Sequence, residues 1–271
     1  MVTRLSYRMV KEIGSELESY DKELKRKTGH TLKQIACHGT DLLKIEPSGG
    51  YKPSVAVIPV SSGQGIIEGF AEAVRDIIEY LGFTSLVTSK TDVAGLAQAI
   101  ERGTDIVFLA DDNCFVAINL KRRYVSDNAI ATAGGYIAAL DYLAGGLRDK
   151  TVLVIGAGDV GKAAAEILKE MGARIVIYDS DSSKAVNVVS RYGAKVERSL
   201  DDALHNYAII LEASPAADVI RAEHIRPETK IAACGIPIGT TGEARSILGD
   251  RLIHDPLQIG VATMMMVCAC L

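Results

Sequence analysis

Thr151-Val152-Leu153-Val154-Ile155-Gly156-Ala157-Gly158-Asp159-Val160-Gly161 is the stretch that decides the fold of this chain. It opens as a β-branched apolar run and ends in the spacing Gly-x-Gly-x-x-Gly. In a dinucleotide-binding turn the first glycine makes the tight exit from the strand, the second lets the backbone approach a pyrophosphate, and the third lets the next helix pack closely. We therefore expect Gly156, Gly158 and Gly161 to take these three roles.

The sequence that follows the turn completes a βαβ unit. Residues 162–171 continue in helical rhythm, and residues 173–179 form a second apolar run that ends in an acid. A pyrophosphate is expected on the free N–H groups that open the helix at Asp159 and Val160, where the helix dipole also favours negative charge. Asp179 lies where a carboxylate accepts a ribose 2′-hydroxyl and repels a 2′-phosphate. The predicted cofactor is therefore NAD rather than NADP.

Length and composition indicate a globular protein of two modest domains. The chain has 271 residues, of which 48% are hydrophobic and 24% charged, and its formal net charge is −4. We expect a substrate domain at residues 1–148 and a nucleotide domain at 149–271. The negative charge argues against nucleic acid as the main partner, because phosphate binding relies on clustered Lys and Arg. A small-molecule ligand fits better.

Targeting signals and cysteines give expectations about location and metals. The first eight residues hold no apolar core of signal-peptide length, and no interior run is long enough to span a bilayer, so we expect a cytoplasmic protein without a membrane partner. The cysteines are odd in number and scattered, with no Cys-x-x-Cys pair or zinc spacing: Cys37, Cys114, Cys234, Cys268 and Cys270. Reduced thiols and no metal site are expected.

The first half is predicted to form helices followed by alternating β and α. Spacings of three and four place an amphipathic helix at residues 6–28 and a short one at 31–36, with a break at Cys37-His38. Strands are expected at 55–60, 84–88 and 105–109, and helices at 66–82 and 92–101. This alternation predicts a parallel sheet whose ligand crevice lies beyond the carboxyl ends of its strands. Two polar clusters follow such ends: Ser61, Ser62, Gly63 and Gly65, and then Asp111, Asp112 and Asn113.

The second half continues as a doubly wound sheet. A long helix at residues 128–143 leads into the nucleotide domain, and further strands are expected at 208–211, 230–233 and 252–257. Residues that follow two of these strands are expected to contact the ribose and nicotinamide, chiefly through their backbone: Glu212, Ala213, Ser214 and Pro215, then Cys234, Gly235, Ile236 and Pro237. The predicted architecture is α/β, with a C-terminal Rossmann-type, doubly wound parallel sheet and an N-terminal α/β substrate domain preceded by helices.

Three further features have both a functional and a structural interpretation. Asp111 and Asp112 can pair with a cationic substrate, or they can form an ordinary turn. Ser61 and Ser62 precede a predicted helix, which they can cap while presenting N–H groups to a carboxylate. His254, beside Asp255, is a candidate for a general acid or base, although a histidine at a strand end is more often structural. The methionines of the last helix suit a core or a homodimer interface.

Three segments of the chain resemble the dehydrogenase that completes pyrrolysine biosynthesis (the PylD family). They are Val55-Ala56-Val57-Ile58-Pro59-Val60-Ser61-Ser62-Gly63-Gln64-Gly65-Ile66-Ile67, Ala110-Asp111-Asp112-Asn113-Cys114-Phe115-Val116-Ala117-Ile118-Asn119 and the generic glycine turn at 154–161. The resemblance covers nearly the whole length. It implies an NAD-dependent oxidation of the terminal amine of 3-methylornithyl-Nε-lysine to an imine or semialdehyde, which cyclises to pyrrolysine. Carried over by position, Ser62 and Asp111 would be substrate contacts, Asn119 a further candidate, and Asp179 would bind the ribose.

Other functions remain compatible with the residues alone. The same glycine spacing also binds FAD or S-adenosylmethionine, and it occurs in turns without a ligand. The chain could be a dehydrogenase of another small amino or hydroxy acid, or a dinucleotide sensor without catalysis. A sensor would bind NADH without turnover, and a shikimate-type enzyme would need a Lys–Asp pair that the first half does not supply.

Overall fold

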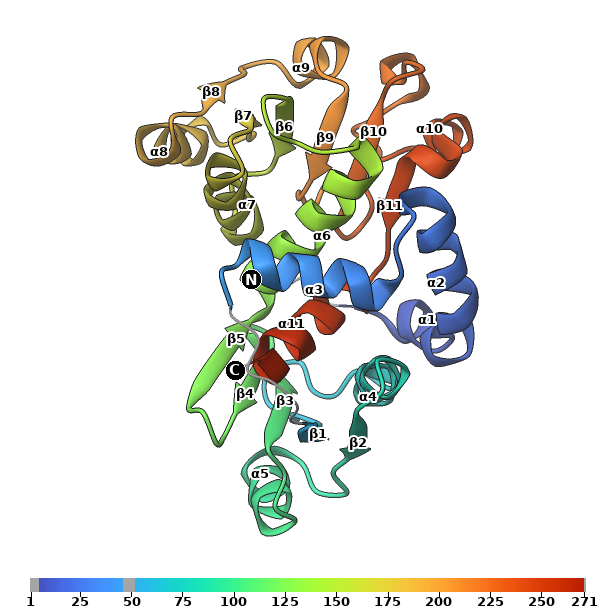
Figure 1. Cartoon of the computed structure of the whole chain (residues 1–271), viewed down its shortest axis with the longest axis vertical. Helices are drawn as coiled ribbons and strands as arrows, with labels where there is room; N and C mark the ends of the chain where they lie inside the picture. The colour runs from blue at the N-terminus through green and yellow to red at the C-terminus, as the bar shows by residue number, and fades with distance from the viewer. Residues whose placement is uncertain (1–4, 46–51, 271) are drawn as a thin grey trace.

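Two β-sheets lie at opposite ends of the computed structural model, which describes residues 5–45 and 52–270, and helices lie between them (Figure 1). The first sheet has the strand order β2-β1-β3-β4-β5. Its strands are β1 (Ser54–Ile58), β2 (Thr84–Val87), β3 (Ile106–Ala110), β4 (Phe115–Asn119) and β5 (Tyr124–Asp127). β1 pairs in parallel with β2 and β3, whereas β4 is antiparallel to both β3 and β5. The expected parallel sheet is confirmed for β1, β2 and β3. It was wrong beyond β3, because residues 111–114 make a hairpin turn that reverses the chain.

The second sheet is doubly wound and wholly parallel. Its order is β11-β10-β9-β6-β7-β8, which reverses direction between β9 and β6. The strands are β6 (Thr151–Ile155), β7 (Arg174–Tyr178), β8 (Lys195–Val196), β9 (Ile209–Glu212), β10 (Lys230–Ala233) and β11 (Leu252–His254). Between them run α7 (Asp159–Glu170), α8 (Ser182–Tyr192), α9 (Leu200–Asn206), α10 (Gly242–Leu248) and the short η1 (Ala222–His224) and η2 (Gly249–Arg251). The predicted fold class is confirmed.

The remaining helices surround the first sheet or separate the two sheets. They are α1 (Tyr7–Val10), α2 (Ile13–Thr28), α3 (Leu32–Leu42), α4 (Phe70–Tyr80), α5 (Asp92–Glu101), α6 (Asn128–Ala144) and α11 (Gln258–Cys270). α6 packs on both α3 and α11, and it also contacts α7 beside the second sheet. α11 follows the last strand of the second sheet and then crosses to pack on α4, β4 and β5. The final helix therefore lies with elements of the N-terminal half.

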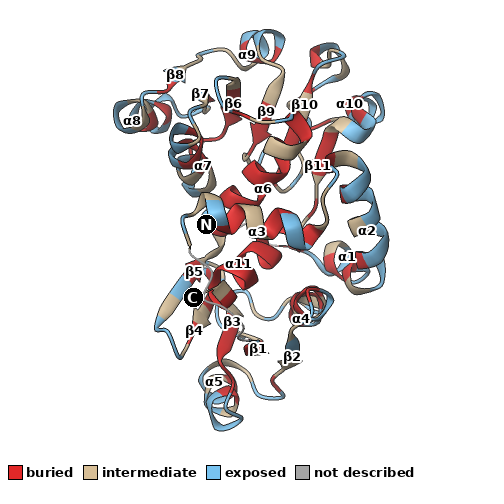
Figure 2. Ribbon diagram, viewed as in Figure 1, coloured by how far each residue is buried: buried red, intermediate tan, exposed pale blue. Residues whose placement is uncertain are grey.

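The central helices form the core between the sheets. Figure 2 shows α6 and α11 buried along most of their length, while the outer face of α2 is exposed. Met264, Met265 and Met266 are 0%, 0% and 8% exposed, so they belong to the core rather than to a surface available for dimerisation. No helix of the described residues is both long enough and apolar enough to cross a membrane.

α3 is longer than the sequence suggested. Thr31 caps it through a capping box with Gln34, and the helix continues to Leu42, so Cys37 and His38 lie within it rather than at a break. Gly39 has a packing role in this helix, because a Cβ at that position would lie 3.0 Å from the backbone of Gly134 in α6. The two helix backbones approach closely at this point.

Gly135 permits the equally close crossing of α6 and α11. A Cβ at Gly135 would lie 2.5 Å from Ile259 Cγ2 and would also overlap Thr263 Oγ1. We expect Gly135→Ala to lower the free energy of unfolding by about 1–3 kcal/mol, because a tightly packed core must shift to accept a methyl group. Urea denaturation of the full chain measures this loss.

Gly242→Ala in α10 is the matched control. Its Cβ would meet only Arg245 Nη2, at 3.7 Å, so the better helix propensity of alanine should leave stability equal or higher. Equal unfolding midpoints for Gly135→Ala and the unaltered protein would contradict the tight crossing.

Candidate active site

The glycine turn after β6 is built as a nucleotide cradle. Gly156 has φ 101°, a left-handed value that favours glycine, and its Cβ would lie 2.6 Å from the carbonyl oxygen of Ala213. A Cβ at Gly161 would overlap the carbonyl oxygen of Gly156, so α7 can pack on the turn only without a side chain there. Gly158 differs, since its Cβ would meet nothing within 4 Å. The open space above Gly158, at the start of the 12-residue α7, fits an approaching pyrophosphate.

Asp179 lies against this turn from the end of β7. Its Oδ2 accepts the N–H of Ala157 at 2.7 Å, and its Oδ1 accepts the N–H of Asp181 at 2.8 Å. The carboxylate is therefore held at the mouth of the cradle by two backbone donors. This is the position in which an acid meets the adenosine ribose in dinucleotide-binding folds.

The turns after β9 and β10 complete the same edge of the sheet. Ala213 N donates to Ile155 O at 2.8 Å, and Cys234 N donates to Glu212 O at 2.9 Å, so both turns are tied to their neighbouring strands. The side chain between them is Glu212, which is 0% exposed. Sequence reasoning named this acid only as part of the turn after β9, because a carboxylate at a strand end is usually solvated.

His254 is oriented at this edge, but Asp255 is not its partner. His254 Nδ1 lies 2.8 Å from the carbonyl oxygen of Ala233, which fixes the ring. The Asp255 side chain instead accepts the hydroxyl of Tyr20 at 2.6 Å and the N–H groups of Leu257 and Ile259 at the start of α11. Asp255 therefore anchors α2 and α11 to the second sheet.

The two polar clusters of the first sheet touch one another. Asp112 Oδ2 accepts the N–H of Gln64 at 2.7 Å, which joins the Asp111–Asn113 turn to the Ser61–Gly65 loop. Ser61 donates its N–H and its hydroxyl to the two oxygens of Asp92, at 2.8 and 2.6 Å, and these bonds lower the pKa of Asp92. The predicted cap was wrong: α4 begins only at Phe70, so neither Ser61 nor Ser62 caps it.

Asp111 combines the two interpretations given above. Its Oδ1 accepts the N–H groups of Asn113 and Cys114, both at 2.8 Å, as in an ordinary turn. The side chain is exposed, and Oδ2 takes no hydrogen bond within residues 5–45 and 52–270. One oxygen thus shapes the turn while the other can receive an ammonium group.

Asn119 is not brought to this group. β4 runs back along β3, so Asn119 pairs with Ile106 at the opposite edge of the sheet from Asp111. It is 2% exposed and donates to the carbonyl oxygen of Cys268 at 2.9 Å. Its observed role is to hold α11 on β4.

The carboxyl edges of the two sheets meet at the starts of α6 and α11. α6 begins at Asn128 directly after β5, on the edge that carries Asp111, and α11 begins at Gln258 shortly after β11. A Cβ at Gly260 in α11 would lie 2.8 Å from Thr132 Oγ1 and 3.4 Å from Asn128 Oδ1 in α6. Because the two helix starts are in contact, the nucleotide cradle and the acidic turn lie on edges that converge.

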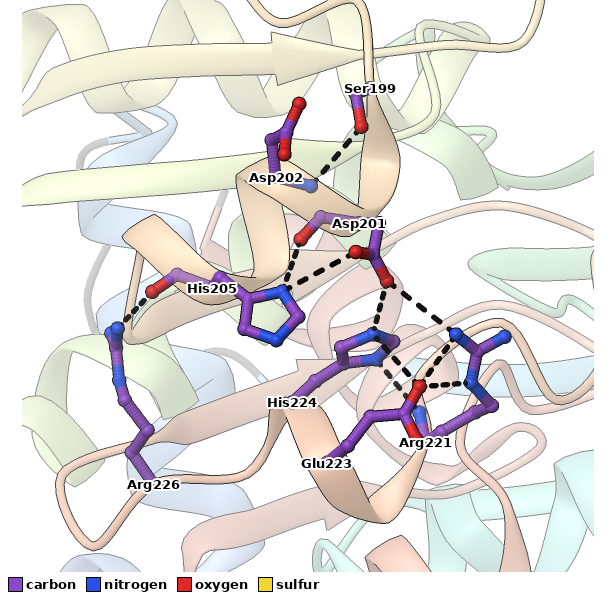
Figure 3. Close-up of polar contacts among 8 residues, drawn as sticks. All are labelled: Ser199, Asp201, Asp202, His205, Arg221, Glu223, His224 and Arg226. Carbon is purple, nitrogen blue, oxygen red and sulfur yellow. Dashed lines mark hydrogen bonds and ion pairs between the residues drawn. The ribbon is translucent and has the colours of Figure 1, made fainter.

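A further polar cluster joins α9 and η1 (Figure 3). Asp201, His205 and His224 bring potential metal-ligand atoms within 4.8 Å of one another. However, His224 Nδ1 accepts the N–H of Arg221 at 3.0 Å, which puts the ring proton on Nε2, 2.9 Å from Asp201 Oδ1. No lone pair remains on Nε2 for a metal, and Arg221 adds a positive charge beside Asp201. We interpret the cluster as a structural link between α9 and η1.

Solved structures share the arrangement of the two sheets. Shikimate dehydrogenase from Aquifex aeolicus has a TM-score of 0.53 at 14% identity, covering 77% of this chain and 88% of that one. Shikimate 5-dehydrogenase from Thermus thermophilus has a TM-score of 0.52 at 17% identity, covering 79% of this chain and 91% of that one. At these identities the likeness shows the fold alone. Residues 131–242 also match the model of the S-adenosyl-L-homocysteine hydrolase NAD binding domain.

The fold, the match to an NAD binding domain and the glycine turn together define the class of protein. It is a Rossmann-type oxidoreductase that uses a nicotinamide dinucleotide. Residues 9–126 match the model described as pyrrolysine biosynthesis protein PylD, N-terminal domain. "Pyrrolysine synthase" of Methanosarcina acetivorans is 34% identical over 257 residues, covering 94% of this chain and 95% of the relative, and that of Methanosarcina barkeri is 33% identical over 256 residues, covering 93% of each. The chain therefore belongs to the pyrrolysine synthase family, which confirms the resemblance drawn from its motifs.

Proposed function

We propose that the protein is an NAD-dependent dehydrogenase that oxidises the terminal amine of 3-methylornithyl-Nε-lysine, giving an imine or semialdehyde that cyclises to pyrrolysine. The observation that carries this proposal is that the Gly158 cradle and the Asp111 turn follow the carboxyl ends of strands in two sheets whose carboxyl edges are joined by the contact between the starts of α6 and α11. One edge suits a dinucleotide and the other suits a cationic amine. The name of the relatives, pyrrolysine synthase, supports the choice of substrate.

The proposed division of labour follows the two sheets. We assign substrate binding to residues 1–148 and dinucleotide binding to residues 149–271, with α11 also covering the first sheet. Dinucleotide binding would use the N–H groups at Asp159 and Val160, Asp179 at the ribose, and the backbone of Ala213–Pro215, Cys234 and Gly235 near the nicotinamide. Ser62, Gly63 and Gly65 would approach the substrate together with Asp111.

The residues of the chain would act mainly by positioning. Bound NAD supplies the hydride acceptor. Asp111 would hold one ammonium group of the substrate and so orient the reacting carbon toward the second sheet. The reacting amine must be neutral for its lone pair to assist departure of the hydride, so no strong acid is needed beside it. His254, fixed on Ala233, is a candidate to accept a proton at this edge.

The reaction is tested by incubating the full chain with NAD and 3-methylornithyl-Nε-lysine. We expect NADH, seen by its absorbance, and a product lighter than the substrate by the elements of ammonia and two hydrogens. The two hydrogens leave as a hydride to NAD and a proton to solvent. Ammonia leaves because water hydrolyses the imine, and the water is returned when the aldehyde condenses with the neighbouring amine. Mass spectrometry of the product measures this directly.

The pH dependence of the same reaction gives a second readout. The rate should rise with pH as the reacting ammonium loses its proton, up to a pKa near or below the model amine value of about 10. NADH formed from a hydroxy acid but not from 3-methylornithyl-Nε-lysine would show a different dehydrogenase. NADH binding without any turnover would show a sensor.

A further inference from the structure

Glu212 lies at the point where the second sheet changes its winding direction. It ends β9, between Ile155 of β6 on one side and Ala233 of β10 on the other. The crevice outside the carboxyl ends of strands at such a switch point is where dinucleotides bind in this fold. A carboxyl group that is 0% exposed is unusual at this position, because acids are rarely buried without a partner.

Two loops are wrapped tightly around this carboxyl group. Glu212 Oε1 accepts the N–H and the hydroxyl of Ser214 at 2.8 and 2.6 Å, which fixes the turn after β9. On the other side, a Cβ at Gly235 would lie 2.5 Å from Oε2, and a Cβ at Gly239 would lie 2.8 Å from Cδ. Only glycine fits at either position while the glutamate side chain stays where it is. Glu212 therefore sets the relative position of residues 213–215 and 234–239.

The second carboxyl oxygen is left unsatisfied. Oε2 is buried and has no hydrogen-bond partner in the described part of the chain. Burial raises the pKa of Glu212 to about 7, although the bonds from Ser214 and weaker interactions with the N–H groups of Gly239 and Gly235 lower it. A purely structural clamp would pair both oxygens, since an unpaired buried acceptor is costly. With a pKa of about 7, the Glu212 carboxyl group changes its charge near neutral pH.

We propose that the ionised Glu212 carboxylate is a positioning residue, which holds the turn after β9 and the loop after β10 in the arrangement that receives the nicotinamide half of the dinucleotide. This inference rests on the proposed dehydrogenase function. The ionised form interacts favourably with the nearby N–H groups of Gly239 and Gly235, whereas the neutral form loses this attraction. Protonation of Glu212 therefore weakens binding of the dinucleotide, and binding of the dinucleotide disfavours protonation of Glu212.

Other titratable groups near Glu212 must be separated from it. The Cys234 thiol of β10 stays neutral, because burial raises its pKa well above its usual range. The Asp255 carboxylate accepts the hydroxyl of Tyr20 at 2.6 Å. The remaining group is His254 of β11, whose ring is fixed on the carbonyl oxygen of Ala233, the residue paired with Glu212. His254→Asn keeps a donor to that oxygen and removes the imidazole.

The test is a titration of the full chain with NADH, followed by fluorescence, at pH values from about 5.5 to 8.5. We expect the affinity of the unaltered protein to rise about fivefold or more with pH, with a midpoint near the Glu212 pKa of about 7. Glu212→Gln keeps the shape and an acceptor for Ser214 but cannot ionise. This variant should bind NADH at least about fivefold more weakly at pH 8 and show no midpoint near 7. The midpoint should persist in His254→Asn.

Two results would decide against the role of Glu212. A Glu212→Gln variant that binds like the unaltered protein at every pH would make Glu212 a loop clamp only. A midpoint lost in His254→Asn would transfer the effect to the imidazole. If Glu212→Gln did not fold, the pH profile of the unaltered protein and of His254→Asn would still decide, because a flat profile in the former excludes the role. Binding of NADH without oxidation of the proposed substrate would contradict the proposed function. The NADH titration would still decide the role of Glu212, because it does not depend on the substrate. No binding at all would overturn both.

Discussion

Replacing Asp111 with asparagine is expected to lower kcat/KM for the proposed substrate by about ten- to a thousandfold, the loss of one or two charged hydrogen bonds. The substitution isolates the charge because of how Asp111 is held. Its Oδ1 accepts the N–H groups of Asn113 and Cys114, and an asparagine oxygen does this equally well. The turn should therefore survive while the exposed Oδ2, the group offered to the ammonium, is lost. Steady-state kinetics together with NADH titration measures both effects, and NADH affinity should not change.

Asp112→Asn is the matched comparison for this prediction. It removes the same charge one residue away, from a carboxylate whose Oδ2 accepts the N–H of Gln64. A smaller loss of kcat/KM is expected, because that oxygen is directed at the neighbouring loop. Kinetics of Asp111→Asn equal to those of the unaltered protein would make Asp111 a turn residue and move the substrate site elsewhere.

The βαβ fold of the nucleotide domain could be predicted because its signals are local. A β-branched run, three glycines at fixed spacing and an acid at the end of the next strand lie within 30 residues of one another, and each has one conformational reason to be there. The structure places Gly156, Gly161 and Asp179 together for those reasons.

The first half was harder because tertiary packing overrides local patterns there. The short helix at 31–36 was expected to break at Cys37-His38, yet α3 continues to Leu42. Its Gly39 lets the backbone of α6 approach closely, a contact that no local pattern predicts. The hairpin at Asp111 was missed, and with it the direction of β4. A residue eight positions beyond Asp111 then falls at the far edge of the sheet, which is why Asn119 packs under α11.

Glu212 shows a different limit of sequence reasoning. It ends the strand Ile209-Ile210-Leu211-Glu212, and a strand-terminal acid is ordinarily solvated. Its burial depends on two glycines, Gly235 and Gly239, that lie more than 20 residues further along the chain. The only local sign is Ser214, two residues on, whose hydroxyl bonds the carboxyl group at 2.6 Å. Burial that arises from two separate loops cannot be read from either one.

Cofactor preference should depend on Asp179. A 2′-phosphate beside this carboxylate would meet a like charge, which costs about 1–4 kcal/mol at 4 Å between bulk water and a protein surface. We expect NAD to bind between about five- and a thousandfold more tightly than NADP, and Asp179→Ala to remove most of that difference. The loss of the bond to Ala157 should also weaken NAD binding itself, so the ratio of the two affinities is the quantity to measure.

Asp181→Asn separates the contact from the general field. Asp181 caps α8 through Ser183, two residues from Asp179, and asparagine caps a helix as well as aspartate does. This variant removes one negative charge near the site but keeps Asp179 in place, so the NAD to NADP ratio should stay close to that of the unaltered protein. Calorimetric titration of both cofactors measures the ratios at low and at high salt, because screening weakens a distant charge more than a contact. An equal drop in the NAD to NADP affinity ratio for Asp181→Asn and Asp179→Ala would assign the preference to the overall charge of this edge. Tighter binding of NADP than of NAD by the unaltered protein would show that Asp179 does not lie at the ribose site.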